Sequence, residues 1–98
     1  MIIVLVHEVS LQDDSVSETL FKAIDSNFRS NKEDVIEDPA FVNYSYEPIV
    51  MVVKINYSQN ECHLYLSELI LESDDPEDLT AYVTNAMING WSTEEPIF

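Results

Sequence analysis

Apolar and polar residues alternate in several stretches of the chain, and these stretches predict strands. Residues 2–9 (IIVLVHEV) carry apolar side chains at both alternating positions, which is typical of a strand covered on both faces. Residues 49–57 (IVMVVKINY) and 61–72 (ECHLYLSELILE) also alternate, and residues 58–60 between them have the length of a hairpin loop. A strand near the N-terminus and a later hairpin are therefore expected.

Residues 11–28 (LQDDSVSETLFKAIDSNF) show helical spacing instead. Ser15 and Glu18 have the spacing of a capping box, in which their side chains satisfy free amide groups at the start of a helix. The apolar positions that follow recur every three or four residues: Val16, Leu20, Phe21, Ile24 and Phe28. This pattern predicts a first helix that ends between Asn27 and Asn31.

The segment between this expected helix and the hairpin is less regular. Residues 29–39 (RSNKEDVIEDP) have mixed charge and no clear period, which predicts a loop or a poorly formed turn of helix. Residues 40–47 (AFVNYSYE) alternate as a strand does, and Pro48 then interrupts the pattern.

A second helix is predicted after residue 75. Asp75 is a favourable N-cap, Pro76 suits the first helical position, and Asp78 stands three residues after the cap. Gly90 occupies the position of a left-handed C-cap, and Trp91 can fold back onto the last turn. The buried stripe of this helix is expected to consist of Leu79, Tyr82, Val83, Ala86 and Met87.

These elements predict an α+β fold in the order β-α-β-β-β-α. We expect a small antiparallel or mixed sheet of three to four strands with two helices packed on one side. The chain has 98 residues, which is enough for one hydrophobic core, so residues 1–98 are interpreted as a single acidic domain.

Charge is the most unusual property of the chain. Asp and Glu number 19 against 4 Lys and Arg, giving a formal net charge of −15, yet 46% of the residues are apolar. Disordered acidic segments lack such a content of apolar residues, so a folded domain is expected despite its self-repulsion. Anionic membranes and nucleic acids would both repel this charge, and we expect direct binding to neither.

The apolar N-terminal stretch does not resemble a targeting signal. It has no basic leading region and no small-residue cleavage site, and it is too short to span a bilayer. Cys62 is the sole cysteine, which fits a reducing compartment. A cytoplasmic location is therefore expected.

Residue patterns that would indicate catalysis or cofactor binding are weak. Gly90 is the single glycine, so a glycine-rich phosphate-binding loop is absent. Cys62 and His63 are adjacent on a predicted strand and point to opposite faces, which prevents a nucleophile–base pair. His7 and His63 could lie on neighbouring strands, but the spacing of a zinc or calcium site is missing. The sequence predicts a protein that is not an enzyme and that holds no cofactor or metal.

Acidic residues dominate the C-terminal part of the chain. Residues 55–98 contain no Lys or Arg, and all of their carboxylates are candidate binding groups: Glu61, Glu68, Glu72, Asp74, Asp75, Glu77, Asp78, Glu94 and Glu95. Carboxylates fixed on strands and helical turns lie roughly 6–10 Å apart, so they could occupy the Lys and Arg side chains that bind nucleic-acid phosphates. This pattern predicts a partner with a basic nucleic-acid-binding groove, such as a nuclease.

Two segments carry a resemblance to a known class of proteins. KINYSQNECHLYL (54–66) and LTAYVTNAMINGWSTEE (79–95) together are similar to the hairpin and the NGW-ending acidic helix of a small phage inhibitor of Cas9. The chain thus resembles the acidic DNA-mimic inhibitors that bacteriophages use against CRISPR nucleases and restriction enzymes. The resemblance covers less than half of the chain. It implies that Glu61, the cluster from Asp74 to Asp78, and Glu94 with Glu95 mimic phosphates.

Other functions fit the same composition. An immunity or antitoxin protein that neutralises a basic nuclease toxin would use the same electrostatics. A small accessory subunit, or a domain from a high-salt organism, would carry its acids only for solvation. A solvation coat should be spread evenly, whereas a mimic should concentrate its charge on a face or along a track. The sequence leaves both a monomer and a homodimer open.

Overall fold

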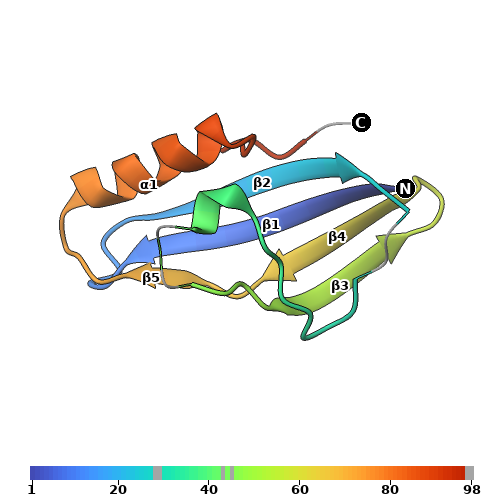
Figure 1. Ribbon diagram of the computed structural model, residues 1–98, viewed down its shortest axis with the longest axis horizontal. Helices are drawn as coiled ribbons and strands as arrows, with labels where there is room; N and C mark the ends of the chain where they lie inside the picture. The colour runs from blue at the N-terminus through green and yellow to red at the C-terminus, as the bar shows by residue number, and fades with distance from the viewer. Residues whose placement is uncertain (28–29, 43, 45, 97–98) are drawn as a thin grey trace.

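Strands dominate the fold. In residues 1–27, 30–42, 44 and 46–96, which the computed structural model describes, five strands form a mixed sheet and one α-helix lies along it (Figure 1). The strands are β1 (Ile2–Leu11), β2 (Ser17–Asp25), β3 (Val50–Asn56), β4 (Glu61–Leu66) and β5 (Leu69–Leu71), and the helix is α1 (Pro76–Ile88). The predicted order β-α-β-β-β-α with two helices is therefore wrong.

Two antiparallel hairpins, β1–β2 and β3–β4, meet in the middle of the sheet. β1 and β4 pair in parallel, which gives the strand order β2-β1-β4-β3, and β5 extends β4 by pairing in parallel with the last residues of β1. In the register, Leu5 lies beside Leu64, and Leu11 lies beside Leu71. β1 is thus the central strand, as its two-sided apolar pattern predicts.

The core lies between the sheet and α1. Alternate residues of β1 (Ile3, Leu5, His7, Val9 and Leu11) are all buried. His7 contacts Tyr82 of α1, which identifies this set as the helix-covered face. The same core cluster includes Leu20 of β2, Leu64 and Leu66 of β4, and Leu79, Tyr82 and Ala86 of α1.

The first predicted helix is in fact strand β2. Ser15 does not cap a helix; its amide and hydroxyl groups both donate to the Asp13 carboxylate in the turn between β1 and β2. The spacing of Val16, Leu20 and Ile24 fits a helix, but Leu20 is buried beside His7 through strand pairing, whereas Val16 and Ile24 are each 40% exposed. Long-range pairing with β1 therefore overrides the local helical pattern. Phe28, the last residue of the expected stripe, lies outside the described residues.

The predicted strand at residues 40–47 is also wrong. Pro39–Phe41 form a short 3-10 helix, η1, whose N-cap Asp38 accepts a hydrogen bond from the amide of Ala40. Ala40 and Phe41 are buried in the core, so these apolar residues belong to a loop that packs on the core and do not form a strand of the sheet. Asn43 and Ser45 lie outside the described residues, as does Arg29 of the predicted loop. The remainder of that loop contains an isolated bridge between Val35 and Ile49.

The hairpin and the C-terminal helix are confirmed. Residues 57–60 connect β3 to β4, and Asn60 adopts a positive φ of 55°, the conformation for which hairpins ordinarily use glycine. Asp75 caps α1 by accepting from the amide of Glu77, and Gly90 has a φ of 95°. Trp91 folds back onto the last turn and is 3% exposed, but Met87, expected in the buried stripe, is 52% exposed.

Candidate functional site

Carboxylates gather at the end of the sheet where β1 and β5 finish and α1 begins (left in Figure 1). The β5–α1 connection and the first helical turn supply Glu72, Asp74, Asp75, Glu77 and Asp78, all of them exposed. The turn between β1 and β2 adds Asp13 and Asp14, and it is tied to this connection by a hydrogen bond from the amide of Gln12 to the carbonyl of Ser73. We refer to these residues as the acidic end.

The carboxylates of the acidic end fall into two groups by their contacts. Asp13 accepts from Ser15, Asp75 caps α1, and Asp78 accepts from the hydroxyl of Ser73, so these groups stabilise turns. The hydrogen bonds from Ser15 lower the pKa of Asp13. Asp14, Glu72, Asp74 and Glu77 are exposed, and no hydrogen bond or ion pair of their side chains is described. These four carboxylates can therefore be used for a partner without weakening the fold.

Three of the predicted binding residues lie at the opposite end of the molecule. Glu61 pairs in register with Ile2 at the start of β1, whereas Leu71, which precedes Glu72, pairs with Leu11 at its end. Because β1 has 10 residues and a strand rises about 3.3 Å per residue, the two ends lie about 30 Å apart. Glu95 lines the same hollow as Glu61, and Glu94 precedes it. The nine predicted carboxylates thus do not form one continuous region.

Glu68 lies between the two ends, on the sheet face that α1 does not cover. Its carboxylate accepts a hydrogen bond of 2.6 Å from the hydroxyl of Ser10, and Ser10 is buried at the position that pairs with Ile70 of β5. Glu68 therefore has a local structural partner at the break between β4 and β5.

Basic side chains are absent from the described part of the acidic end. Lys22 is partly buried on β2 and forms an ion pair of 2.7 Å with Asp38. Lys32 and Lys54 are exposed, but Lys54 pairs in register with His63, near the start of β1, and Lys32 lines a hollow next to β3. His63 lies 3.5 Å from Glu61. Within the described residues, the exposed lysines therefore lie near the β3–β4 hairpin, and no basic side chain neutralises the charge of the acidic end.

Asp13 and Asp14 are members of the acidic end that sequence reasoning did not place there. They lie near the β5–α1 connection because β1 and β2 form a hairpin with its turn there. The segment after them has the spacing of a helix, so the sequence does not predict this turn. The signal that could have found them is the pair Asp13–Asp14 followed by Ser15, a typical turn sequence, because Asp tolerates the left-handed conformation that Asp14 adopts (φ 60°).

A second notable group is the buried histidine under α1. His7 has no exposed surface, and its Nε2 lies 2.7 Å from the hydroxyl of Tyr82, while its Nδ1 lies 3.4 Å from the hydroxyl of Tyr46. Phe41 and Trp91 pack against the ring edge-on. Burial lowers the pKa of His7 to about 4, so the imidazole is neutral near pH 7. A buried neutral ring with no described access to solvent indicates a structural role.

The proton positions around His7 follow from its partners. The hydroxyl of Tyr46 donates to the carbonyl of Ser67, so its oxygen is left to accept from the imidazole. The consistent arrangement has Nδ1–H donating to Tyr46 and the hydroxyl of Tyr82 donating to Nε2. Burial also raises the pKa of both tyrosines, which keeps their hydroxyl protons in place.

The other patterns considered from the sequence are separated by the fold. Cys62 is buried with the core while His63 points to the other face, as predicted. His7 and His63 lie on neighbouring strands but on opposite faces of the sheet. Among the residues described, no group of three or more His, Cys, Asp or Glu is placed to hold a metal ion. No helix in the described part of the chain is long and apolar enough to cross a membrane.

Comparisons with known proteins provide no family assignment. Searches against protein-family models, curated proteins and solved structures each found no match. The resemblance to phage DNA-mimic inhibitors therefore stays a prediction, and the function has to be argued from the acidic end itself.

Proposed function

We propose that this protein is a non-enzymatic inhibitor that binds the basic nucleic-acid-binding site of another protein and blocks it by competition. The observation that carries the proposal is the acidic end, where carboxylates from two separate segments meet without a basic residue among those described. In keeping with the sequence resemblance, we propose a defence nuclease of the CRISPR or restriction type as the partner. The site of action would be the cytoplasm, that of the host if the protein is phage-encoded.

The geometry supports competition through phosphate-like charges. Asp74 and Glu77 lie on either side of the helix start, and Asp13 and Asp14 extend the charge onto the neighbouring turn. Lys and Arg side chains that bind a DNA backbone meet one charge about every 1.7 Å along the axis, so an array of fixed carboxylates offers them comparable partners. Long-range attraction would also speed the encounter.

Rigid support distinguishes this array from a flexible acidic tail. The N-cap of Asp75 and the hydrogen bond between Ser73 and Asp78 hold the connection against the start of α1, and the strand pair Leu11–Leu71 anchors its other side. Because these residues are already ordered, little conformational entropy would be lost on binding. Glu61, Glu94 and Glu95 lie at the opposite end of the molecule, near the β3–β4 hairpin. They would form a second contact only with a partner surface long enough to reach both ends.

The proposal is tested by capture from a lysate of a suspected host, with the purified full chain as bait. We expect the bait to retain a nucleic-acid-binding protein at low salt and to release it when duplex DNA is added or salt is raised. The captured enzyme should lose DNA binding when the inhibitor is present. Retention that DNA does not displace would contradict competition at a nucleic-acid site, and retention of no basic protein would favour the solvation interpretation.

A further inference from the structure

Residues 36–48, of which 36–42, 44 and 46–48 are described, form a loop whose two ends are joined (green in Figure 1). At its base, Val35 and Ile49 form an isolated antiparallel bridge, and the amide of Ile36 donates to the carbonyl of Pro48 at 2.9 Å. A compact surface loop with joined ends is an Ω-loop, a type of loop that frequently has a function.

The aromatic side chains of this loop are held against the core. Phe41 packs edge-on against His7 with 5.2 Å between the ring centroids, and Tyr46 stacks on the same imidazole at 5.3 Å. Tyr44 packs edge-on against Tyr82 of α1 at 4.7 Å. Because these contacts already order the three rings, little conformational entropy would be lost if a ligand bound beside them.

A hollow of about 890 Å³ lies in this loop, which is within the size range of sites for small molecules. The three aromatic rings line it together with Ile36, Val42 and Pro48. The hollow is much larger than one amino-acid side chain, so its volume and its apolar lining suit a small molecule with an aromatic body.

Carboxylates supply the charged part of the lining. Glu37 and Glu47 are exposed, and no hydrogen bond or ion pair of either side chain is described. Asp38 also lines the hollow, but it already accepts from Lys22 and Trp91. The described lining residues include no Lys, Arg or His. The hollow therefore combines an aromatic wall with two carboxylates that have no positive partner in the described part of the chain.

We propose that this hollow binds a small organic cation in which a planar amidinium or guanidinium group is attached to an aromatic body. Glu37 and Glu47 would accept from the N–H groups of the cation, because such a planar group can donate two parallel hydrogen bonds to one carboxylate. The aromatic body would pack against the rings of the loop. A neutral or anionic ligand of the same shape would cover the carboxylates without a positive charge to compensate them, which is unfavourable. The site is separate from the acidic end and does not rest on the proposed function.

The experiment titrates the ¹⁵N-labelled full chain with benzamidinium, benzamide or benzoate and follows the amide chemical shifts by NMR. The three probes have nearly the same shape and differ in charge, so they distinguish recognition of charge from burial of a ring. We expect benzamidinium to cause saturable shifts in the loop, benzamide to bind at least about tenfold more weakly, and benzoate not to bind. Equal affinity for benzamidinium and benzamide would overturn the proposal, as would a lack of saturable shifts in the loop.

Neutralising variants distinguish this site from the general attraction of a chain with a net charge of −15 for any cation. Glu37→Gln/Glu47→Gln removes both charges and should weaken benzamidinium binding by at least about tenfold. Asp74→Asn/Glu77→Gln removes the same charge from the acidic end and should leave the affinity nearly unchanged. Equal weakening by the two variants would show that benzamidinium is only a counterion, and it would overturn the proposal.

A second pair of variants keeps the proposal falsifiable if the first pair is unstable. Val42→Lys places a positive charge in the lining and should weaken benzamidinium binding by at least about tenfold. Ile88→Lys on α1 is the matched control, because Val42 and Ile88 are both 79% exposed, and it should have little effect. Equal effects of the two lysines would contradict a site in the loop. Thermal unfolding shows whether each variant is folded.

A fourth probe tests the source of the cation. Nα-acetylarginine amide carries the same planar cation on an aliphatic stem, as a protein side chain does. We expect it to bind at least about tenfold more weakly than benzamidinium, because it has no ring to pack against the aromatic wall. Equal or tighter binding would identify a protein side chain as the occupant and would overturn the assignment to an aromatic small molecule.

Discussion

His7 shows how one residue couples the stability of this fold to pH. Its ring is fully buried between β1 and α1, its two nitrogens face tyrosine hydroxyls, and burial lowers its pKa to about 4. Besides Tyr46 and Tyr82, the groups packed around the ring are Phe41 and Trp91, which do not titrate. Among the described neighbours, no carboxylate is in contact with the ring to stabilise an imidazolium.

Stability should therefore fall as the pH is lowered through the unfolded-state pKa of His7. The unfolded chain binds a proton near pH 6.5, but the folded chain does not until about pH 4. Stability from this residue is complete above pH 6.5 and is lost between pH 6.5 and 4. At pH 5 the expected loss in the free energy of unfolding is about 2 kcal/mol, and urea denaturation at pH 7.5 and 5.0 would measure it.

The matched control for this pH effect is His7→Gln, which retains a polar side chain but does not titrate. The variant is expected to be less stable at pH 7.5, yet its stability should change less between pH 7.5 and 5.0 than that of the wild type. Subtracting the two profiles removes the contribution of the many carboxylates. Parallel profiles would show that His7 can be protonated without cost in the folded protein.

Gly90 is the second residue whose role can be isolated. Its φ of 95° is unfavourable for an L-residue, while an added Cβ would meet Lys22 Cε at an ordinary contact of 3.5 Å. Backbone strain therefore determines the cost. Gly90→Ala should lower the unfolding free energy by about 1–2 kcal/mol, and Gly90→Asn by less, because Asn tolerates this conformation. Equal stability of the three proteins in thermal unfolding would contradict this account.

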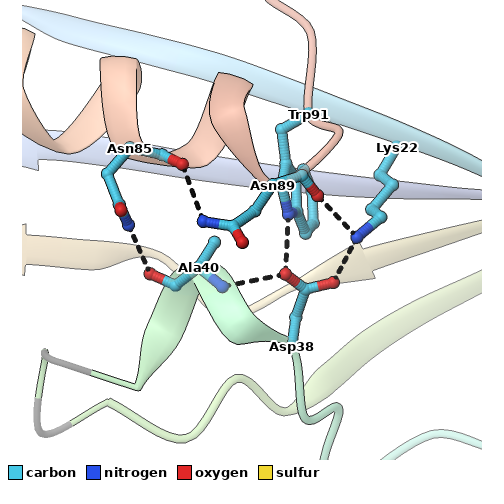
Figure 2. Close-up of polar contacts among 6 residues, drawn as sticks. All are labelled: Lys22, Asp38, Ala40, Asn85, Asn89 and Trp91. Atoms are coloured by element: carbon cyan, nitrogen blue, oxygen red, sulfur yellow. Dashed lines mark hydrogen bonds and ion pairs between the residues drawn. The ribbon is translucent and has the colours of Figure 1, made fainter.

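At the scale of elements, one polar network joins β2, η1 and the end of α1 (Figure 2). The Asp38 carboxylate accepts from Lys22, Trp91 and the amide of Ala40, and Lys22 also donates to the carbonyl of Asn89. Burial alone would raise the pKa of Asp38, but these hydrogen bonds outweigh it and lower the pKa below its usual value. The network fixes the loop that holds Phe41 against His7.

Breaking this network from either side should be costly and non-additive. Asp38→Ala leaves the indole N–H of Trp91 without its acceptor and leaves Lys22 with the carbonyl of Asn89 alone, and we expect a loss of about 3 kcal/mol or more. Lys22→Met keeps the aliphatic stem and should cost less, since Lys22 reaches solvent. A double-mutant cycle by urea denaturation should give a coupling of about 1–2 kcal/mol, and strict additivity would argue against a direct interaction.

The sequence predicts those elements whose determinants are local. The cap at Asp75, the proline after it and the glycine at position 90 define α1, and the alternation around residues 58–60 defines the hairpin. β2 and the segment 40–47 were misassigned because their states depend on distant partners: β2 pairs with β1, and Ala40 and Phe41 fill the core. The acidic end was found only in part for the same reason, since Asp13 and Asp14 reach it through that pairing.

At the scale of the whole molecule, charge is unevenly distributed along an elongated shape of 42 × 26 × 22 Å. The acidic end lies at the last residues of β1. Glu61, Glu94 and Glu95 lie near the first residues of β1, where the exposed Lys54 also lies. Other carboxylates, such as Glu37 and Glu47, lie on the intervening loop. The acidic end thus holds seven of the 19 acidic residues of the chain.

Self-repulsion should make the folded protein salt-sensitive. Raising NaCl from 20 to 500 mM screens the like charges and should increase the unfolding free energy by about 1 kcal/mol. The variant Asp74→Lys/Glu77→Lys relieves repulsion at the acidic end, so its stability should respond less to salt. Chemical denaturation with urea, which is uncharged, measures both. A wild-type stability that decreases with salt would mean that attractive ion pairs dominate.

The measurement that tests the central claim most directly compares two charge-reversed variants for affinity to the captured partner by isothermal titration calorimetry. Asp74→Lys/Glu77→Lys alters the acidic end, and Glu37→Lys/Glu47→Lys makes the same charge change at exposed positions elsewhere. The account predicts that the first variant loses at least about tenfold in affinity and the second very little. Equal losses would show that only net charge matters, and they would contradict a binding site at the acidic end.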